Sequence, residues 1–173
     1  MVVAGGIMDF LNPDSDTSQA PNSEQKTTTT NPTPEEVLSP EEAIKKKAEE
    51  NLSYKKRLRD VQITTNDGQY SVKVILNADS NLSANLTKQS VRKDVSSVFY
   101  GLFKEDAGVE YAVVTTYYPT VDAYGNKNEA IIYQARLVAS EAKKINWSQD
   151  KTQVEASILP DLWETELDKL DQL

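Results

Sequence analysis

Two pairs of carboxyl residues are candidates for catalysis: Asp122 with Glu129, and Glu105 with Asp106. In a glycosidase or another hydrolase, one carboxyl of such a pair acts as a general acid while the other acts as a base or nucleophile. The acid must be shielded from water so that its pKa rises. Both pairs fall in polar turn sequences, where nothing indicates burial. We therefore expect a protein that is not an enzyme, and a carboxylate-dependent hydrolase remains an alternative.

The chain contains no His and no Cys. This composition excludes His-activated nucleophiles, thiolate chemistry, disulfides and zinc sites of the usual ligand set. The stretch Asn66-Asp67-Gly68 is similar to part of a calcium loop, but the ligand spacing and the terminal Glu of such a loop are missing. We expect no metal and no cofactor.

The polar stretch of residues 120–129 is the best candidate for a recognition surface. Gly125-Asn126 marks a turn between two runs of strand-forming residues. Exposed tyrosines beside adaptable Asn and Asp side chains are typical of binding surfaces. An ordinary hairpin loop is the alternative interpretation. The side chains expected to gather near the tip are Tyr117, Tyr118, Asp122, Tyr124, Asn126 and Glu129.

The elements that would carry this surface can be predicted from periodicity. Residues 109–118 and 130–139 are β-branched and aromatic, and alternating residues 58–63 and 70–76 flank Asp67-Gly68, so two hairpins are expected. Between them, residues 87–104 have helical spacing, with Asp94 and Ser97 on the polar face. The expected fold is α+β: a small antiparallel sheet of two hairpins with one main amphipathic helix packed across it, plus a C-terminal helical segment.

Two further helices are predicted at the borders of this α+β domain, which we expect to span residues 54–173. Ser39-Pro40-Glu41-Glu42 has the pattern of a capping box and begins a lead-in helix over residues 39–53. Pro160 opens an amphipathic C-terminal segment that docks on the protein's own core or, alternatively, binds a partner. Its apolar side would consist of Leu162, Trp163, Leu167 and Leu170.

The formal net charge of -8 restricts the partners. Nucleic-acid binding depends on cations that displace counterions, so we expect no nucleic-acid partner. The one dense basic cluster, residues 54–59, lies at an expected helix-to-strand junction. It is interpreted as a solvated junction, and a binding patch is the alternative. A protein or a cell-surface component is the expected partner, and the oligomeric state is open.

The first 38 residues have a different character. Residues 1–11 form an apolar segment that is shorter than the roughly 20 residues a helix needs to cross a bilayer. This segment is interpreted as the remnant of a transmembrane helix, a docking segment or a frayed tail. Residues 12–38 are rich in Ser, Thr and Pro, and we expect a disordered spacer.

Three segments, VDAYGN (residues 121–126), EAKKINW (141–147) and ILPDLWET (158–165), resemble parts of uncharacterised membrane-anchored proteins of Gram-positive bacteria and their phages. The resemblance implies a membrane anchor, a polar spacer and a small domain on the extracellular face. The leading hypothesis is accordingly a non-catalytic binding or sensing domain displayed outside the cell. The alternative is a soluble, acidic, cytoplasmic protein, for example one that a phage encodes, that inhibits a host protein through its surface.

Overall fold

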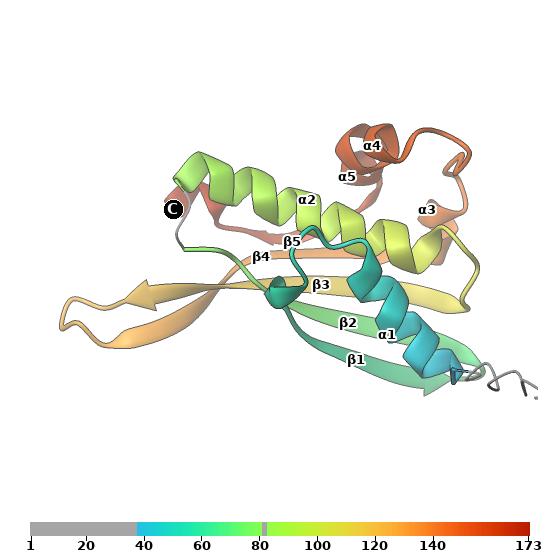
Figure 1. The fold of residues 1–173 in the computed structure, drawn as a ribbon, viewed down its shortest axis with the longest axis horizontal. Coiled ribbons are helices and arrows are strands. Elements are labelled where there is room, and N and C mark those ends of the chain that lie inside the picture. Colours follow the sequence, from blue (N-terminus) through green and yellow to red (C-terminus); the bar gives the residue numbers. More distant parts are fainter. Residues whose placement is uncertain (1–37, 81–82) are drawn as a thin grey trace, which may run out of the picture. The chain divides into compact units, whose positions relative to one another are not determined.

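The computed structural model describes residues 38–80 and 83–173 (Figure 1). The predictions for the apolar segment 1–11 and for the spacer up to residue 37 lie outside these residues. Within the described part of the chain, no helix combines the length and the apolar character needed to cross a membrane. The elements in chain order are α1 Pro40–Glu50, η1 Lys55–Arg57, β1 Leu58–Asn66, β2 Gln69–Asn77, α2 Ala84–Phe103, β3 Val109–Val121, β4 Lys127–Val138, α3 Ala139–Ala142, α4 Lys151–Gln153, η2 Val154–Ile158, α5 Leu159–Leu162, β5 Glu164–Asp168 and η3 Leu170–Gln172.

Five strands form one sheet in the order β1-β2-β3-β4-β5. The α+β class and both expected hairpins are confirmed, since β1 pairs antiparallel with β2 and β3 pairs antiparallel with β4. The sheet is not wholly antiparallel, because β2 and β3 run parallel at its centre. A parallel pair needs a crossover connection, and α2 supplies it.

The two predicted turns form where the sequence places them, but the second loop is shorter than expected. Asp67 and Gly68 adopt positive φ angles of 48° and 79°, as a tight hairpin turn requires. In the second hairpin the strands continue to Val121 and from Lys127, so only residues 122–126 remain between them. The tip therefore lies at the end of a long two-stranded ribbon.

Helix α2 packs across the sheet, as its apolar spacing predicts. Ser83 caps the helix by accepting a hydrogen bond from the N–H of Leu86, so α2 begins three residues before the predicted start at residue 87. The expected polar face is only partly correct: Asp94 and Ser97 are buried with the apolar residues. The buried apolar side chains of α2 are Val91, Val95, Val98, Phe99, Tyr100 and Leu102.

Helix α1 forms within the segment 39–53, over Pro40–Glu50, and it packs into the same core as the strands. Ser39 and Glu42 make both hydrogen bonds of the capping box. Ile44 and Ala48 are buried, and Figure 1 shows α1 on the same face of the sheet as α2. The N–H of Leu52 closes the last turn on the carbonyl of Glu49. Four-residue spacing of small and aliphatic side chains is therefore enough to bury one stripe of this highly charged helix.

The C-terminal segment differs from the prediction. Helix α5 ends at Leu162, because Trp163 adopts extended angles (φ -80°, ψ 151°). Strand β5 then pairs with the outer edge of β4, and only the short η3 turn follows it. The prediction of an amphipathic helix that continues through Leu167 and Leu170 was wrong. The N–H and C=O groups at an unpaired sheet edge form hydrogen bonds with an added strand. The spacing of apolar residues along the sequence contains no information about such an edge.

Replacing Leu170 by Ala tests whether the C-terminal segment belongs to the core. Leu170 is fully buried, so we expect Leu170→Ala to lower the free energy of unfolding by about 2 kcal/mol. Urea denaturation measures this loss, with Leu173→Ala as the control at a half-buried position. Equal losses in the two variants would contradict the assignment.

Candidate functional site

The β3–β4 hairpin carries the surface that the sequence singles out. β2 pairs with β3 only as far as Tyr117, and β5 pairs with β4 only from Tyr133 onward. Beyond these residues the two strands pair only with each other, and Figure 1 shows the hairpin projecting past the other strands. Its tip is therefore accessible from several sides.

The tip loop is organised by one carboxylate. Oδ1 of Asp122 accepts hydrogen bonds from the backbone N–H groups of Tyr124 at 2.9 Å and Asn126 at 2.8 Å, while Oδ2 accepts one from Nδ2 of Asn126 at 2.8 Å. The N–H of Gly125 closes the turn on the carbonyl of Asp122, and Gly125 supplies a positive φ of 86°. The side-chain amide and backbone N–H of Asn126 hold the pKa of Asp122 below its ordinary value. Both carboxylate oxygens of Asp122 are thus used in hydrogen bonds that hold the loop conformation.

Tyr124 is the side chain that this loop displays. Its exposed fraction is 91%, and Val121 beside the turn is 66% exposed. Together they expose apolar surface at the tip, and an aromatic side chain with only two χ angles loses little entropy when it binds a partner. The tip therefore presents a Tyr and a Val on a loop with a defined backbone.

The base of the hairpin is fastened to β1. Nη1 of Arg59 lies 2.7 Å from Oε2 of Glu129, and its guanidinium lies 5.2 Å from the ring centroid of Tyr117. The hydrogen bond to Glu129 raises the pKa of Arg59 above its ordinary value. Tyr118 points to the opposite side, as alternation along a strand requires, and packs against the core.

The structure therefore brings together only part of the predicted surface. Asp122, Tyr124 and Asn126 form the tip, whereas Tyr117 and Glu129 belong to a separate cluster around Arg59 at the base. Tyr118 belongs to neither group. Sequence reasoning separated Arg59 from this region because the contact joins residues 70 positions apart in the chain.

Replacing Asp122 by Ala is expected to release the tip loop without unfolding the sheet. The change removes the acceptor for two backbone N–H groups and one amide, so amide hydrogen exchange at Tyr124 and Asn126 should accelerate. Because the pKa of Asp122 is lowered, acidification should have the same effect only as the pH falls through that lowered pKa. Unchanged exchange at both amides in Asp122→Ala would contradict this role.

A second site was not predicted, and it lies in the basic cluster at residues 54–59. Nη1 of Arg57 lies 2.8 Å from Oδ2 of Asp94 and also donates to Oγ of Ser90. The side chains of Arg57 and Asp94 are only 12% and 6% exposed. Burial raises the pKa of Asp94 in spite of the hydrogen bond from Arg57. Far from being solvated, this part of the cluster forms a buried ion pair under a surface cleft.

One sequence signal could have indicated this site. Asp94 lies three residues after Val91 and directly before Val95, so it borders the apolar stripe of α2. A carboxylate in that position is buried together with the apolar stripe and then needs a cation beside it. Otherwise the helix would have to rotate so that the carboxylate faces solvent. Its partner Arg57 lies 37 residues away, and only the tertiary structure identifies it.

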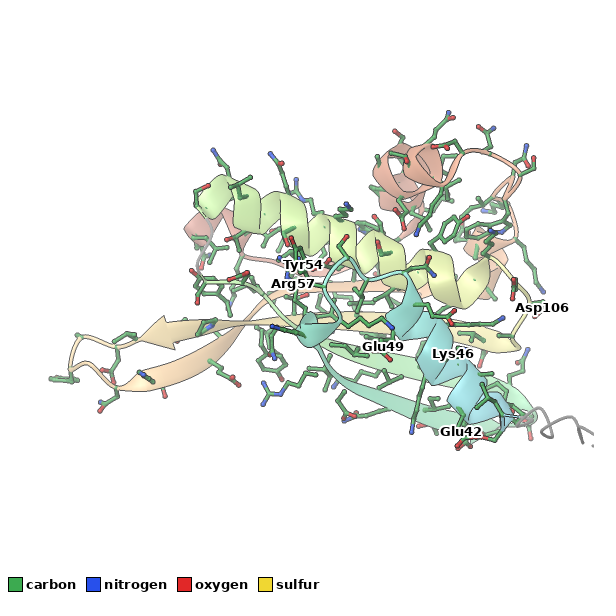
Figure 2. All side chains as sticks on the ribbon, in the orientation of Figure 1. Glu42, Lys46, Glu49, Tyr54, Arg57 and Asp106 are labelled. Carbon is green, nitrogen blue, oxygen red and sulfur yellow. The ribbon has the colours of Figure 1, made fainter. Side chains whose placement is uncertain are left out.

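The other carboxyl pair that could serve hydrolysis has structural partners. Oε2 of Glu105 lies 2.9 Å from Nζ of Lys47, which lowers the pKa of Glu105 below its ordinary value. Oδ1 of Asp106 accepts a hydrogen bond from the N–H of Gly108 in the loop that joins α2 to β3 (Figure 2). A lowered pKa is the opposite of what a general acid needs.

The alternative partner-binding residues are divided by the structure. Trp163 and Leu170 are buried, and the Trp163 ring lies 5.6 Å from that of Phe99 in α2. Leu162 and Leu167 are half-buried on either side of the helix end. Leu162, Trp163 and Leu170 therefore contribute to the protein's own core, whereas Leu167 is not packed against it.

The sequence matches no protein-family model and no curated protein, and the fold matches no solved structure. The class of protein is accordingly defined by its architecture: an α+β domain with helices on one face of a mostly antiparallel five-stranded sheet and a projecting hairpin.

Proposed function

We propose that this chain is a non-catalytic binding module that recognises a protein or a cell-surface component through the tip of its β3–β4 hairpin. The observation that carries the proposal is the 91% exposure of Tyr124 on a loop whose backbone Asp122 and Asn126 hold in place. Preorganisation of this kind reduces the entropy lost on binding.

The hairpin favours side-chain recognition over strand addition. Pro119 carries no backbone N–H, and Lys127 and Glu129 place charges on the projecting part of β4. Proline and charged residues are the usual protection of a strand edge against pairing with another chain. The accessible binding groups are therefore the side chains at the tip.

Display outside the cell is part of the proposal, and it is supported by the sequence alone. An apolar segment at residues 1–11, followed by a Ser/Thr/Pro-rich spacer, would hold the domain away from a membrane. A hairpin that projects from the domain suits a partner on another surface.

Photo-crosslinking in cells that make the protein tests this function. A photoreactive phenylalanine analogue replaces Tyr124, and the same analogue at Gln69, exposed at the β1–β2 turn, serves as the control. We expect an adduct with one partner at position 124 and none at position 69. The partner is then purified, and its affinity should fall about tenfold or more in Tyr124→Ala but not in Gln69→Ala.

Two results would refute the proposal. Adducts of equal yield at both positions would show that the crosslinks report nonspecific contacts. A purified partner that binds Tyr124→Ala as tightly as the unsubstituted chain would show that the tip is not the binding site.

A further inference from the structure

A cleft on the helical side of the domain has the dimensions of a small-ligand site. It has a volume of about 610 Å³, and small-molecule pockets commonly measure roughly 300–1,000 Å³. It lies between the segment that links α1 to β1 and the first half of α2. Its lining residues are Ser53, Tyr54, Arg57, Asp79, Leu86, Gln89, Ser90, Lys93 and Asp94.

The floor of the cleft is polar and fixed. The Arg57–Asp94 pair lies there, with Ser90 bonded to the same guanidinium nitrogen and Oδ2 of Asp79 at 3.9 Å from Nη2 of Arg57. Because the pair is buried and shares several partners, its groups hold their positions before any ligand arrives. A preformed polar floor is a common feature of sites that orient a small ligand.

Two exposed apolar side chains stand among the polar residues that line the cleft. Tyr54 is 62% exposed and Leu86 is 52% exposed, and they are two of only five large apolar side chains with such exposure in the described part of the chain. The Arg57 guanidinium lies 4.7 Å from the ring centroid of Tyr54 and supports one side of the ring. Figure 2 shows Tyr54 and Arg57 on the same segment beside α2. The ring is thus held at the cleft while much of its surface stays open to a ligand.

The formal charges of the residues that line the cleft sum to zero. Arg57 and Lys93 contribute two positive charges, while Asp79 and Asp94 contribute two negative charges. Arg57 and Asp94 are paired with each other, and Lys93 and Asp79 are opposite in sign, so the lining has no net charge that would attract an anionic or a cationic ligand. A neutral ligand with many hydrogen-bonding groups does not depend on such an attraction.

We propose that this cleft binds a neutral saccharide ring. A sugar ring has an apolar C–H surface that can lie against Tyr54 and Leu86. Each of its hydroxyls can both donate and accept hydrogen bonds, which matches the donors of Lys93 and the amide of Gln89, together with the hydroxyl of Ser53. This site is separate from the hairpin tip and uses none of its residues.

NMR titration of the full chain with three related probes tests the proposal. Glucose, glucosamine and glucuronic acid share one ring and differ in charge. At neutral pH and equal ionic strength, we expect glucose to shift the backbone amide signals of residues 53–57 and 89–94, and the two charged probes to bind more weakly. Tyr54→Ala should weaken glucose binding about tenfold, while Tyr54→Phe should retain it because the ring remains.

Tyr124→Ala is the matched control, because it removes an exposed tyrosine elsewhere and should leave the titration unchanged. The proposal is overturned if glucose shifts no cleft signal up to its solubility limit, or if a charged probe binds as tightly as glucose. It is also overturned if Tyr54→Ala binds glucose like the unsubstituted chain. Loss of binding in Tyr124→Ala alone would instead assign the sugar to the hairpin tip.

Discussion

Arg57→Met is expected to lower the free energy of unfolding by about 3 kcal/mol at neutral pH, because it leaves the buried carboxylate of Asp94 without its cation. Met fills a similar volume with a flexible apolar side chain, so the change removes the charge and the hydrogen bonds rather than the packing. Urea denaturation of both proteins measures the difference.

The pH dependence of this loss distinguishes charge from packing. Burial already raises the pKa of Asp94 in the unsubstituted chain, so this group's contribution to stability is greatest below its ordinary pKa and falls as the pH rises through the raised value. Without Arg57 the pKa should rise further, and the fall should deepen. The two proteins should therefore differ least in acid, where Asp94 is protonated in both.

A second substitution provides the control. Asp94→Asn removes the negative charge, so the double variant Arg57→Met/Asp94→Asn should recover most of the stability that Arg57→Met loses. Asp94→Asn by itself should have a small effect, since Asp79, Ser90 and the ring of Tyr54 still surround Arg57. A loss that is the same at every pH and is not recovered in the double variant would show that Arg57 acts through packing alone.

Gly101→Ala is expected to lower the free energy of unfolding by about 3 kcal/mol, because the added methyl group collides with the backbone of α1. A Cβ at position 101 would lie 2.1 Å from the carbonyl oxygen of Lys47 and 2.8 Å from Nδ2 of Asn51. The first contact is with backbone and cannot be relieved by a change of rotamer. Helix α1 would have to move away from α2.

Whether Gly101→Ala lowers or raises the free energy of unfolding shows whether the two helices are in close contact at this position. In an unobstructed helix, Gly→Ala stabilises by roughly 1 kcal/mol, so a large loss identifies the close approach of the two helices. Hydrogen exchange should show α1 losing protection before the sheet does. Asn85→Ala, at an exposed position in the first turn of α2, is the control and should change stability by less than about 0.5 kcal/mol. Equal or greater stability of Gly101→Ala would show that α1 has room to shift.

Local patterns were sufficient for the elements that depend on neighbouring residues. The capping box at Ser39 and Glu42, the Asp67-Gly68 turn and the apolar spacing of α2 each depend on residues within a few positions of one another. Each is therefore visible in a single sequence. The same holds for the tip loop, where Asp122 and Asn126 are four residues apart.

Pairings between distant segments were decided only by the tertiary structure. The parallel contact of β2 with β3, the addition of β5 to the edge of β4 and the burial of Asp94 against Arg57 depend on which surfaces meet after the chain has folded. Residues 164–168 have helical periodicity, yet they form a strand because an unpaired sheet edge lies beside them.

The amino-acid sequence by itself thus determined the class of fold, the two hairpins, the main helix and the tip on which Tyr124 stands. The tertiary structure decided the order of the strands, the division of the predicted surface into tip and base, and the existence of the cleft beside Tyr54. The physical reason is range: hydrogen-bonded turns, caps and apolar stripes are local, whereas buried ion pairs and sheet edges are satisfied by partners dozens of residues away.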